Sequence, residues 1–522
     1  MKVETDMGMA GLYIKGGQKM KSKIVKKLIA ASLATMMVVG MAGCGNETAD
    51  TGNTGNTGNT GASKESTSDS GSSNTGSSDA ATPTEAPVED VSPYPVITDA
   101  DGNAIDLGGM EIIIRDWWSS GEVEEPNNAF EEAQQEYREW IQETYNFTIK
   151  EQAISDWGST PQDFVDYATT GGDENYVFVL RQGGEFVSAM NSGLMYDLST
   201  LDCLDFSEEK WNTNGLHKVA AGTNGEIYAM RGIEPEPRGG MYFNKRLAEE
   251  AGVSPDDIYK LVENGEWTWE KFEEICAQVQ QDTDNDGTID IYAMVQQGAQ
   301  FYKEAVASNN GHFVDKVDGK YAFALDTQQT LDALTWAVEM RKQYEMPQPE
   351  GSNWDFFLAE FRNGKAVFFE DQAYRANQDL KEMTDDFGFL PFPMGPNAEG
   401  YNSWYEDNPI VIPACYDAEK AWNLAFAYNL WTEPIAGYED TENWKTTYYS
   451  QFRDLESVDI SVAKLVKNGS VTYHDFVAGI DLGNDILYNL GNAGSDGTVA
   501  TPAQKAEELK NSWQAYIDEA NN

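Results

Sequence analysis

Short apolar runs alternate along this chain with stretches in which apolar residues recur every three or four positions. Glu111–Arg115 (EIIIR) and Tyr176–Leu180 (YVFVL) have the length and composition of buried strands, whereas Asn127–Tyr145 has the period of an amphipathic helix. Strands and helices that alternate at this spacing predict a parallel or mixed sheet covered on both faces.

The same alternation resumes later in the chain. Lys365–Phe369 and Phe387–Leu390 are predicted strands, and Ala418–Trp431 is a helix apolar nearly all round, hence buried. A final helix begins at Thr501, with Gln504 placed to complete a capping box. The patterned region holds about 430 residues, which is enough for two α/β lobes.

The first ninety residues follow a different pattern. Lysines precede the apolar run Leu28–Val39, which is too short to span a bilayer comfortably and ends in small residues before Cys44. We therefore expect a signal peptide over 20–43. Residues 45–92 contain no aromatic residue, Leu or Ile, so they cannot bury enough surface to offset their chain entropy, and 44–92 is predicted to be Cys44 followed by a disordered linker. Residues 1–19 fit no signal, and we expect them to be an untranslated extension ahead of Met20.

The end of this predicted signal resembles the lipobox of bacterial lipoproteins. Cys44 follows Ala-Gly directly, although Met41 stands where the pattern prefers Leu. The resemblance implies that Cys44 becomes the lipidated N-terminus at the extracellular face of the bacterial cytoplasmic membrane. Ordinary secretion with an unmodified cysteine is the alternative.

The charge of the chain excludes some classes of partner. Lys plus Arg number 36 against 87 Asp plus Glu, for a formal net charge of −51, so the average field repels nucleic acid and anionic lipid. Four cysteines without a CxxC pair indicate neither a disulfide framework nor a zinc site, and Cys276 is predicted to be a buried free thiol. The supply of rings, with 14 Trp and 25 Tyr, favours a globular protein with a ring-lined site.

Four stretches in order resemble one known family. They are GGMYFNKRLAEEAGV (Gly239–Val253), the Trp-Thr-Trp helix start and Asp-rich turn of Trp267–Met294, NGKAVFFEDQAY (Asn363–Tyr374) and DFGFLPFPMGP (Asp386–Pro396). This pattern is similar to the extracellular solute-binding proteins of ABC importers, in particular family 1, which mostly captures sugars and oligosaccharides. The resemblance covers roughly residues 108–520.

The resemblance implies a periplasmic-binding-protein-like fold of type II. In that fold two α/β lobes, each a mixed sheet flanked by helices, are joined by crossing segments at a hinge. Here the crossings would lie near Ile227–Pro235, Phe387–Pro393 and Glu433–Gly437. The first lobe would then comprise 93–230 plus 392–434, and the second 231–391 plus 435–522.

Sugar capture requires two kinds of side chain. The C–H face of a sugar packs on flat rings, while its hydroxyls need planar donors and acceptors, and such groups converge at the carboxyl ends of parallel strands. Tyr374 stands where the family usually has a stacking Trp. The predicted ligand-binding residues are Asp116, Trp117, Trp118, Trp157, Arg181, Glu370, Asp371, Tyr374, Trp404 and Tyr405. For each of them, packing in a lobe is the alternative role.

The Asp-rich turn has the spacing of a calcium loop. Asp282, Asp284, Asp286, Thr288 and Asp290 fit positions 1, 3, 5, 7 and 9. Position 12 should be a bidentate Glu but is Ala293, so a complete site would need a distant acid. Calcium binding and a solvated turn both remain open, and no other cofactor is expected.

The pattern as a whole indicates a non-catalytic function. We expect the protein to bind a saccharide outside the cell by hinge closure and to deliver it to the permease subunits of an ABC importer. One alternative is a surface-anchored glycoside hydrolase, which needs paired carboxylates about 5–10 Å apart. Another is the same fold with a peptide or other small solute as ligand.

Overall fold

The computed structural model describes residues 92–122, 125–212, 215–222, 224–232, 239–405, 408–438, 442, 445–466, 468–492 and 499–522. The predicted signal peptide, Cys44 and nearly all of the predicted linker lie outside these residues. Glu89–Asn522 form one compact unit. In the described part of the chain, no helix is long and apolar enough to cross a membrane.

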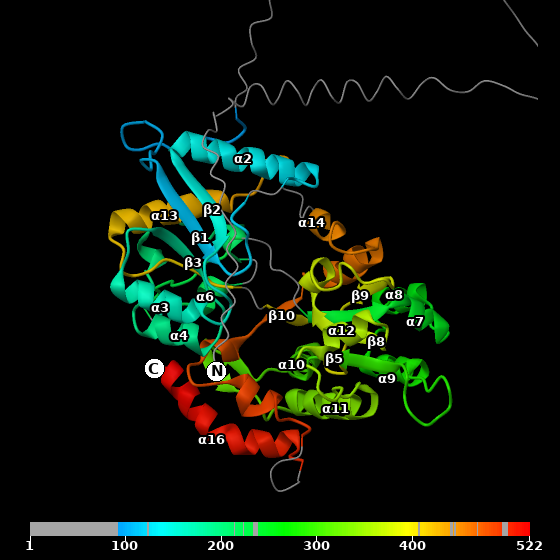
Figure 1. The fold of residues 1–522 in the computed structure, drawn as a ribbon. Coiled ribbons are helices and arrows are strands. Elements are labelled where there is room, and N and C mark those ends of the chain that lie inside the picture. Colours follow the sequence, from blue (N-terminus) through cyan, green and yellow to red (C-terminus); the bar gives the residue numbers. More distant parts are fainter. Residues whose placement is uncertain are drawn as a thin grey trace, which may run out of the picture. The chain divides into compact units, whose positions relative to one another are not determined.

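The first lobe is built on a four-stranded sheet of order β11-β3-β1-β2 (Figure 1). β1, β2 and β3 are parallel, and β11 pairs antiparallel with β3. The elements are β1 (Met110–Asp116), α2 (Ala129–Tyr145), β2 (Phe147–Ala153), α3 (Thr160–Thr170), β3 (Asn175–Val179), α4 (Gly184–Asn191), η2 (Leu198–Thr200), α5 (Glu209–Asn212), α6 (Leu216–Val219), β11 (Ile410–Val411) and α13 (Ala418–Trp431).

Both faces of this sheet are covered, as the continuous apolar strands predict. The side chains of Ile112, Ile114 and Val177 pack with those of α2 and α13, whereas Phe178 packs with α3 and α4 on the other face. The two helices on the first face also contact each other, because the Arg138 guanidinium lies 3.6 Å from a ring centroid of Trp431.

The second lobe has a sheet of order β5-β8-β4-β9. β5 and β8 are parallel, while β4 runs antiparallel to both β8 and β9. Its elements are β4 (Gly239–Asn244), α7 (Lys245–Glu250), α8 (Pro255–Glu263), α9 (Trp269–Val279), β5 (Tyr292–Gln296), α10 (Gly298–Ser308), β6 (Val314–Val317), β7 (Lys320–Phe323), α11 (Gln328–Tyr344), α12 (Phe356–Arg362), β8 (Ala366–Gln372), η3 (Ala373–Asn377) and β9 (Phe387–Leu390).

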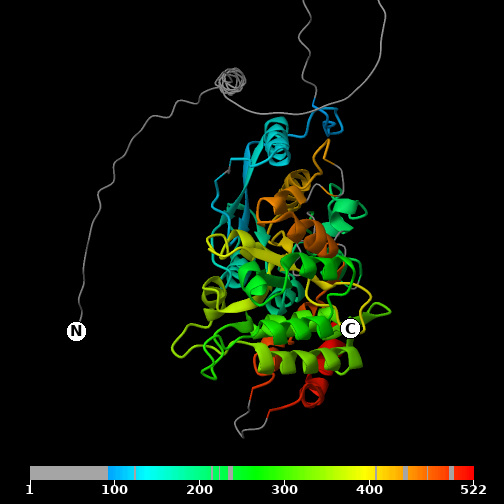
Figure 2. The ribbon, with the colours of Figure 1, turned by 90° about the vertical axis from the view of Figure 1, so that its right-hand side faces the viewer.

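The C-terminal part of the chain completes the second lobe. It contains α14 (Lys445–Tyr449), η4 (Ser457–Val462), α15 (Ala463–Leu465), η5 (Tyr473–Phe476), η6 (Gly483–Leu487) and α16 (Pro502–Ala520), and a short parallel pair joins β10 (Ser403–Tyr405) to β12 (Gly469–Val471). The Thr501–Gln504 capping box is present at the start of α16, as predicted. Two perpendicular views place α2 of the first lobe and α16 far apart (Figure 1, Figure 2).

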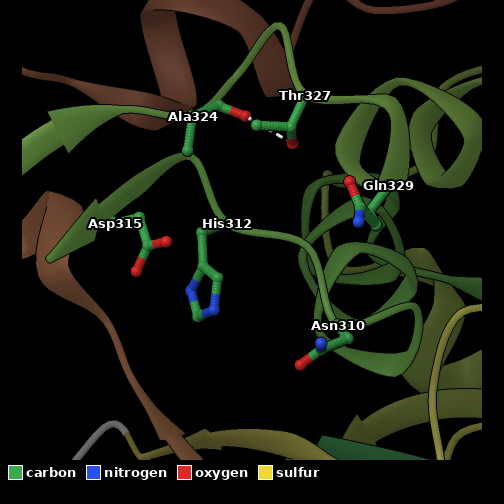
Figure 3. Close-up of a pocket in the computed structure, with 6 residues that line it drawn as sticks. All are labelled: Asn310, His312, Asp315, Ala324, Thr327 and Gln329. Atoms are coloured by element: carbon green, nitrogen blue, oxygen red, sulfur yellow. Dashed lines mark hydrogen bonds between the residues drawn. The ribbon is translucent and has the colours of Figure 1, made fainter. Parts of the chain in front are cut away.

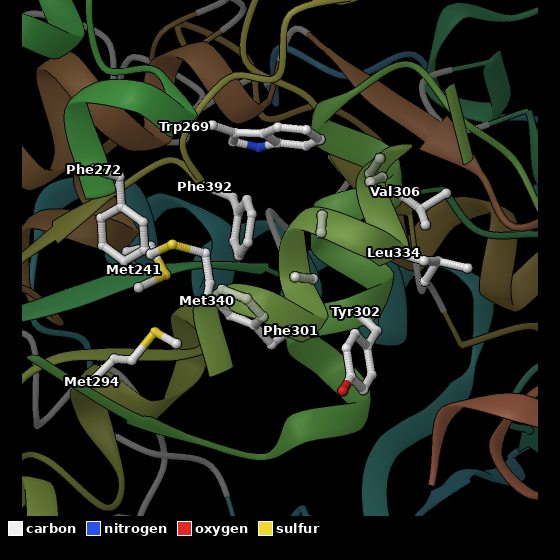
Figure 4. Close-up of a cluster of buried hydrophobic side chains, with 14 of the residues drawn as sticks. Met241, Trp269, Phe272, Met294, Phe301, Tyr302, Val306, Leu334, Met340 and Phe392 are labelled. Atoms are coloured by element: carbon white, nitrogen blue, oxygen red, sulfur yellow. The ribbon is translucent and has the colours of Figure 1, made fainter. Parts of the chain in front are cut away.

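The core of the second lobe is rich in rings and methionines (Figure 4). Trp269 of α9 stacks on Trp336 of α11 with the ring centroids 4.3 Å apart, and Phe301 packs edge-on against Phe392. Cys276 is completely buried, which raises the pKa of its thiol and agrees with the predicted free cysteine.

The predicted α/β fold with two mixed sheets is confirmed, but the second predicted crossing is placed too early. β9 pairs with β4 inside the second sheet, and Phe392, Tyr401 and Trp404 all pack in the second core. The chain returns to the first sheet only at Ile410. Residues 392–405 therefore belong with the second lobe, because their apolar side chains are buried there.

The third predicted crossing is also early. Ile435 and Tyr438 still pack in the first core, so the chain leaves the first lobe after 438. At the first crossing, Met230 belongs to the first core and Gly239 begins β4, so the passage lies within 231–238, of which 233–238 are outside the described residues.

Candidate functional site

Three predicted segments meet at one edge of the first sheet. In the parallel register Asp116 stands opposite Ala153, and Arg115 stands opposite Phe178. The carboxyl ends of β1, β2 and β3 are therefore level, and the residues that follow each strand emerge at the same edge. This is the edge at which open α/β sheets bind ligands.

Two of the tryptophans at this edge are exposed. Trp118 is 51% exposed and meets the half-buried Trp117 edge-on, with the ring centroids 5.0 Å apart. Trp157 is 56% exposed, and the Arg181 guanidinium lies 4.0 Å from its ring centroid. Arg181 also pairs with Glu185, so the cation is held from two sides and orients the indole.

Asp116 differs from its prediction. Its side chain is buried, and its carboxylate accepts hydrogen bonds from the backbone N–H groups of Trp118 and Ser119 and from the Ser119 hydroxyl. These bonds hold the turn that carries the two tryptophans. Asp116 therefore positions the rings, and its carboxylate does not face outward as a binding group.

The second lobe places Glu370, Asp371 and Tyr374 at the carboxyl end of β8. Both carboxylates are buried, and Asp371 pairs with Arg375 at 3.1 Å. Burial raises the pKa of Asp371, and the neighbouring Arg375 opposes that rise. Tyr374 is half-buried, with the Arg375 guanidinium 4.9 Å from its ring centroid. Arg375 thus orders this turn through both neighbours.

Trp404 is a core residue and not a wall of the site. It is 1% exposed, its Nε1–H donates to the Lys303 carbonyl at 2.8 Å, and its ring packs among the second core. Neighbouring Tyr405 is half-buried, and a Cβ added at Gly469 would overlap its ring. Both rings hold the β10–β12 pair, which is a structural role.

Sequence reasoning missed Trp354. This side chain is 71% exposed and lies just before α12. A turn of three residues connects α12 to β8, and the helix packs on that strand through Phe357 and Phe361, whose rings both contact Phe369. The available signal was a tryptophan inside a polar, glycine-containing segment, Gly351–Asp355.

Hydrogen bonds connect the two edges to a common junction. In the second lobe, the Gly239 N–H at the start of β4 donates to Ser403 Oγ of β10 at 3.2 Å. β10 pairs with β12, and the next residue, Thr472, donates from Oγ1 to Gln182 Oε1 of the first lobe at 2.6 Å. Gln182 directly follows Arg181, so this chain of contacts runs from one sheet edge to the other.

The Asp-rich turn brings three carboxylates together. Ligand oxygens of Asp282, Asp284 and Asp290 lie within 4.8 Å of one another. Asp286 instead accepts from the Thr288 N–H. Hydrogen bonds from Thr283 lower the pKa of Asp290, so this carboxylate is charged at neutral pH. The position-12 residue, Ala293, is buried in β5 and offers no ligand. Oxygen donors of this kind suit Ca²⁺.

A separate cavity of about 300 Å³ lies in the second lobe (Figure 3). It is lined by Asn310, His312, Asp315, Ala324, Thr327 and Gln329. Burial lowers the pKa of His312, which keeps the imidazole neutral. Every lining residue belongs to one lobe and none is a predicted ligand-binding residue, so a molecule bound here would not bridge the lobes.

Comparison with known proteins identifies the class that this fold and site define. The family model described as bacterial extracellular solute-binding protein matches residues 130–441, which is more than half of the chain. The chain therefore belongs to the bacterial extracellular solute-binding proteins, the receptors that serve ABC importers. A comparison with curated proteins found no match.

Solved structures with similar folds include three whose ligands are stated. The cyclic alpha-maltosyl-1,6-maltose binding protein of Arthrobacter globiformis is 12% identical, with a TM-score of 0.55 over 79% of this chain and 100% of that one. The GacH receptor of Streptomyces glaucescens, solved with acarbose, is 15% identical, with a TM-score of 0.52 over 79% and 99%. UgpB of Mycobacterium tuberculosis, solved with glycerophosphocholine, is 16% identical, with a TM-score of 0.51 over 74% and 95%.

Proposed function

We propose that the protein captures a saccharide outside the cell, between the carboxyl edges of its two sheets, and passes it intact to the permease of an ABC importer. The observation that carries this proposal is the pair of exposed indoles at the carboxyl edge of the first sheet, Trp118 and Trp157, together with the exposed Trp354 of the second lobe. Large apolar rings left in water at such an edge favour a ligand with a flat C–H face, which a sugar has.

Closure follows from a ligand that touches both lobes. A saccharide stacked on Trp157 and also held at the end of β8 favours the conformation in which both edges contact it. The passages of the chain between the two sheets would act as the hinge. Opening would then release the saccharide without breaking a bond.

Two other functions give different outcomes. The similar structure of UgpB with glycerophosphocholine is the reason to consider a non-sugar solute on this fold. A hydrolase would need two carboxylates across a scissile bond, but the buried Asp371 is engaged with Arg375. The rings favour saccharide capture over both.

A ligand panel tests the proposal. The protein comprising residues 89–522 is heated with maltotetraose, acarbose, cyclic maltosyl-maltose, glycerophosphocholine or a tripeptide, and the melting temperature is compared with that of the free protein. We expect an increase with at least one saccharide, and no new reducing ends after incubation. A response to glycerophosphocholine or peptide alone would contradict saccharide capture, and cleaved saccharide would indicate the hydrolase.

We also propose that Cys44 is lipidated and holds the mature protein at the outer face of the cytoplasmic membrane. The proposal is supported by the Ala-Gly-Cys sequence after an export signal and by membership of an extracellular family. The full chain expressed in a Gram-positive host should partition with the membrane, whereas a Cys44→Ala variant should not become lipid-modified, as intact mass would establish. An unmodified wild-type N-terminus would contradict this.

We further propose that the loop from Asp282 to Asp290 binds Ca²⁺. Three carboxylates within 4.8 Å repel one another unless a cation lies between them, and Ca²⁺ accepts such oxygen ligands. The loop directly precedes β5, whose other end reaches the proposed saccharide site. The cation would therefore have a structural role, ordering the entry into that strand.

A further inference from the structure

A buried glutamine at the end of β5 has no hydrogen-bond partner among the described residues. Gln296 is the last residue of the strand and is 2% exposed. Among the residues that the structure describes, neither its amide Nε2 nor its Oε1 has a hydrogen-bond partner. Burying both ends of an amide unpaired lowers the stability of the fold, so the residue needs an explanation.

The other buried amides of this lobe are paired. Asn244 accepts from the Leu247 N–H and donates to Asp385, and Asn309 donates to the Gln329 carbonyl and accepts from the Asn397 N–H. These side chains connect secondary-structure elements to one another. Gln296 makes no such connection, so a role within the fold does not account for it.

The position of Gln296 is at the proposed saccharide site. In the parallel register it stands opposite Glu370, so both side chains point to the same side of the sheet. Glu304 of α10 approaches the same place, because a Cβ added at Gly239 would fall 2.1 Å from its carboxyl group. Three buried polar side chains thus gather at the end of β8 that leads into the turn of Tyr374.

We propose that Gln296 is a solute-binding residue that forms hydrogen bonds with hydroxyl groups of the captured saccharide. This inference rests on the function proposed above. Its Nε2–H donates to one hydroxyl oxygen, and its Oε1 accepts from another hydroxyl. A sugar offers both a donor and an acceptor, whereas a phosphodiester offers acceptors only and would leave Oε1 unpaired. Gln296 therefore favours hydroxyl groups over a phosphodiester group at this point of the bound solute.

The variant Gln296→Met tests this proposal, because Met has nearly the same length and shape without the polar atoms. Without solute, we expect its melting temperature to exceed that of the wild type by about 2 °C, since a buried unpaired amide is removed. With maltotetraose, acarbose and cyclic maltosyl-maltose, we expect the affinity for each saccharide that binds the wild type to fall about tenfold or more.

Ser461→Ala is the matched control. Ser461 is also fully buried in the second lobe with no described partner for its hydroxyl, but it lies in η4, on the opposite face of the sheet. Removal of this hydroxyl should raise or preserve the melting temperature and leave saccharide affinity unchanged.

Two results for Gln296→Met would contradict the proposed role of Gln296. A melting temperature of Gln296→Met below that of the wild type would mean that the amide is paired within the fold, and saccharide affinity equal to that of the wild type would mean that it does not touch the solute. Either result overturns the role of Gln296 and leaves saccharide capture standing. If the wild type responds to none of the saccharides, the proposed function fails, and the role of Gln296 fails with it.

Discussion

Tryptophan has two opposite roles in this protein, and exposure separates them. Trp267 and Trp404 are buried, and the N–H group of each donates to a backbone carbonyl, of Pro391 and Lys303 respectively. Trp157 and Trp354 are more than half exposed. An indole that remains in water forgoes the free energy of burial, which ligand binding can recover.

Removal of the Trp157 ring should weaken saccharide binding. A stacked ring contributes ~0.5–1.5 kcal/mol beyond its area, so Trp157→Ala should raise Kd about threefold to tenfold in titration calorimetry with the best saccharide of the panel. Trp157→Phe should restore part of the affinity. Trp422→Ala removes a ring that stacks on Phe426 away from the edge and should leave Kd unchanged. Equal Kd for Trp157→Ala and wild type would exclude this ring from the site.

The carboxylate of Asp385 in the second lobe should make the free energy of unfolding depend on pH. Hydrogen bonds from Arg246 lower the pKa of Asp385 from 3.8, with Asn244 adding to the effect. Because the folded pKa lies below the unfolded one, this stabilisation is complete above about pH 4 and is lost as pH falls through the folded pKa.

Asp385→Asn should therefore destabilise the protein at neutral pH and matter less in acid. We expect a loss of roughly 1 kcal/mol at about pH 7, since the partner Arg246 is half-exposed, and a smaller difference near pH 3. Urea unfolding at both pH values measures it. Asp257→Asn removes an exposed pair with Lys260 and serves as the control. A difference between Asp385→Asn and wild type that grew in acid would contradict the assignment.

At the scale of elements, the middles of the strands pack in the core, and the candidate site residues lie at the strand ends. β8 is buried over Ala366–Asp371, yet its last residues lead directly into the Tyr374–Arg375 turn. β5 likewise begins after the Asp-rich loop and ends at Gln296. Parallel pairing brings these ends level, so loops distant in sequence share one edge.

The Asp-rich loop should respond to calcium. Addition of Ca²⁺ to chelator-treated protein should raise the melting temperature, since a ligand that binds only the folded state stabilises it. Asp282→Asn combined with Asp284→Asn should abolish the increase, while Mg²⁺, which holds its waters more tightly, should act more weakly. We expect Thr288 to contribute only its backbone carbonyl, so Thr288→Ala should leave the increase in place. An identical melting curve with and without Ca²⁺ would leave a solvated turn as the role of this loop.

At the scale of the whole chain, separate passages of the backbone join the two lobes. Besides the hinge segments, the chain from β12 to η5 returns to the first lobe, where Phe476 packs on Phe186 with the ring centroids 6.0 Å apart and Thr472 bonds to Gln182. Each lobe has its own core, which the proposed closure requires.

Saccharide binding should bring the lobes together. We expect the radius of gyration of residues 89–522, measured by small-angle X-ray scattering, to decrease when the best saccharide of the panel is added. Trp157→Ala should need a higher saccharide concentration for the same decrease, because the ring contributes to binding and not to the hinge. Unchanged scattering under saturating saccharide would exclude closure.

The sequence by itself determined the α/β lobes, many of their strands and helices, the capping box, and the positions of Trp118, Trp157 and Arg181 after strands of the first sheet and of Tyr374 after β8 of the second. These features follow from the spacing of apolar residues and from the succession of strands and helices along the chain. Both depend on residues that are close in sequence. Only the tertiary structure decided that Trp404 is core, that Asp116 holds a turn, that the crossing follows Tyr405 and that Trp354 is exposed. Those properties depend on contacts between residues far apart in sequence. From the sequence alone, a buried aromatic or acidic residue cannot be distinguished from an exposed one.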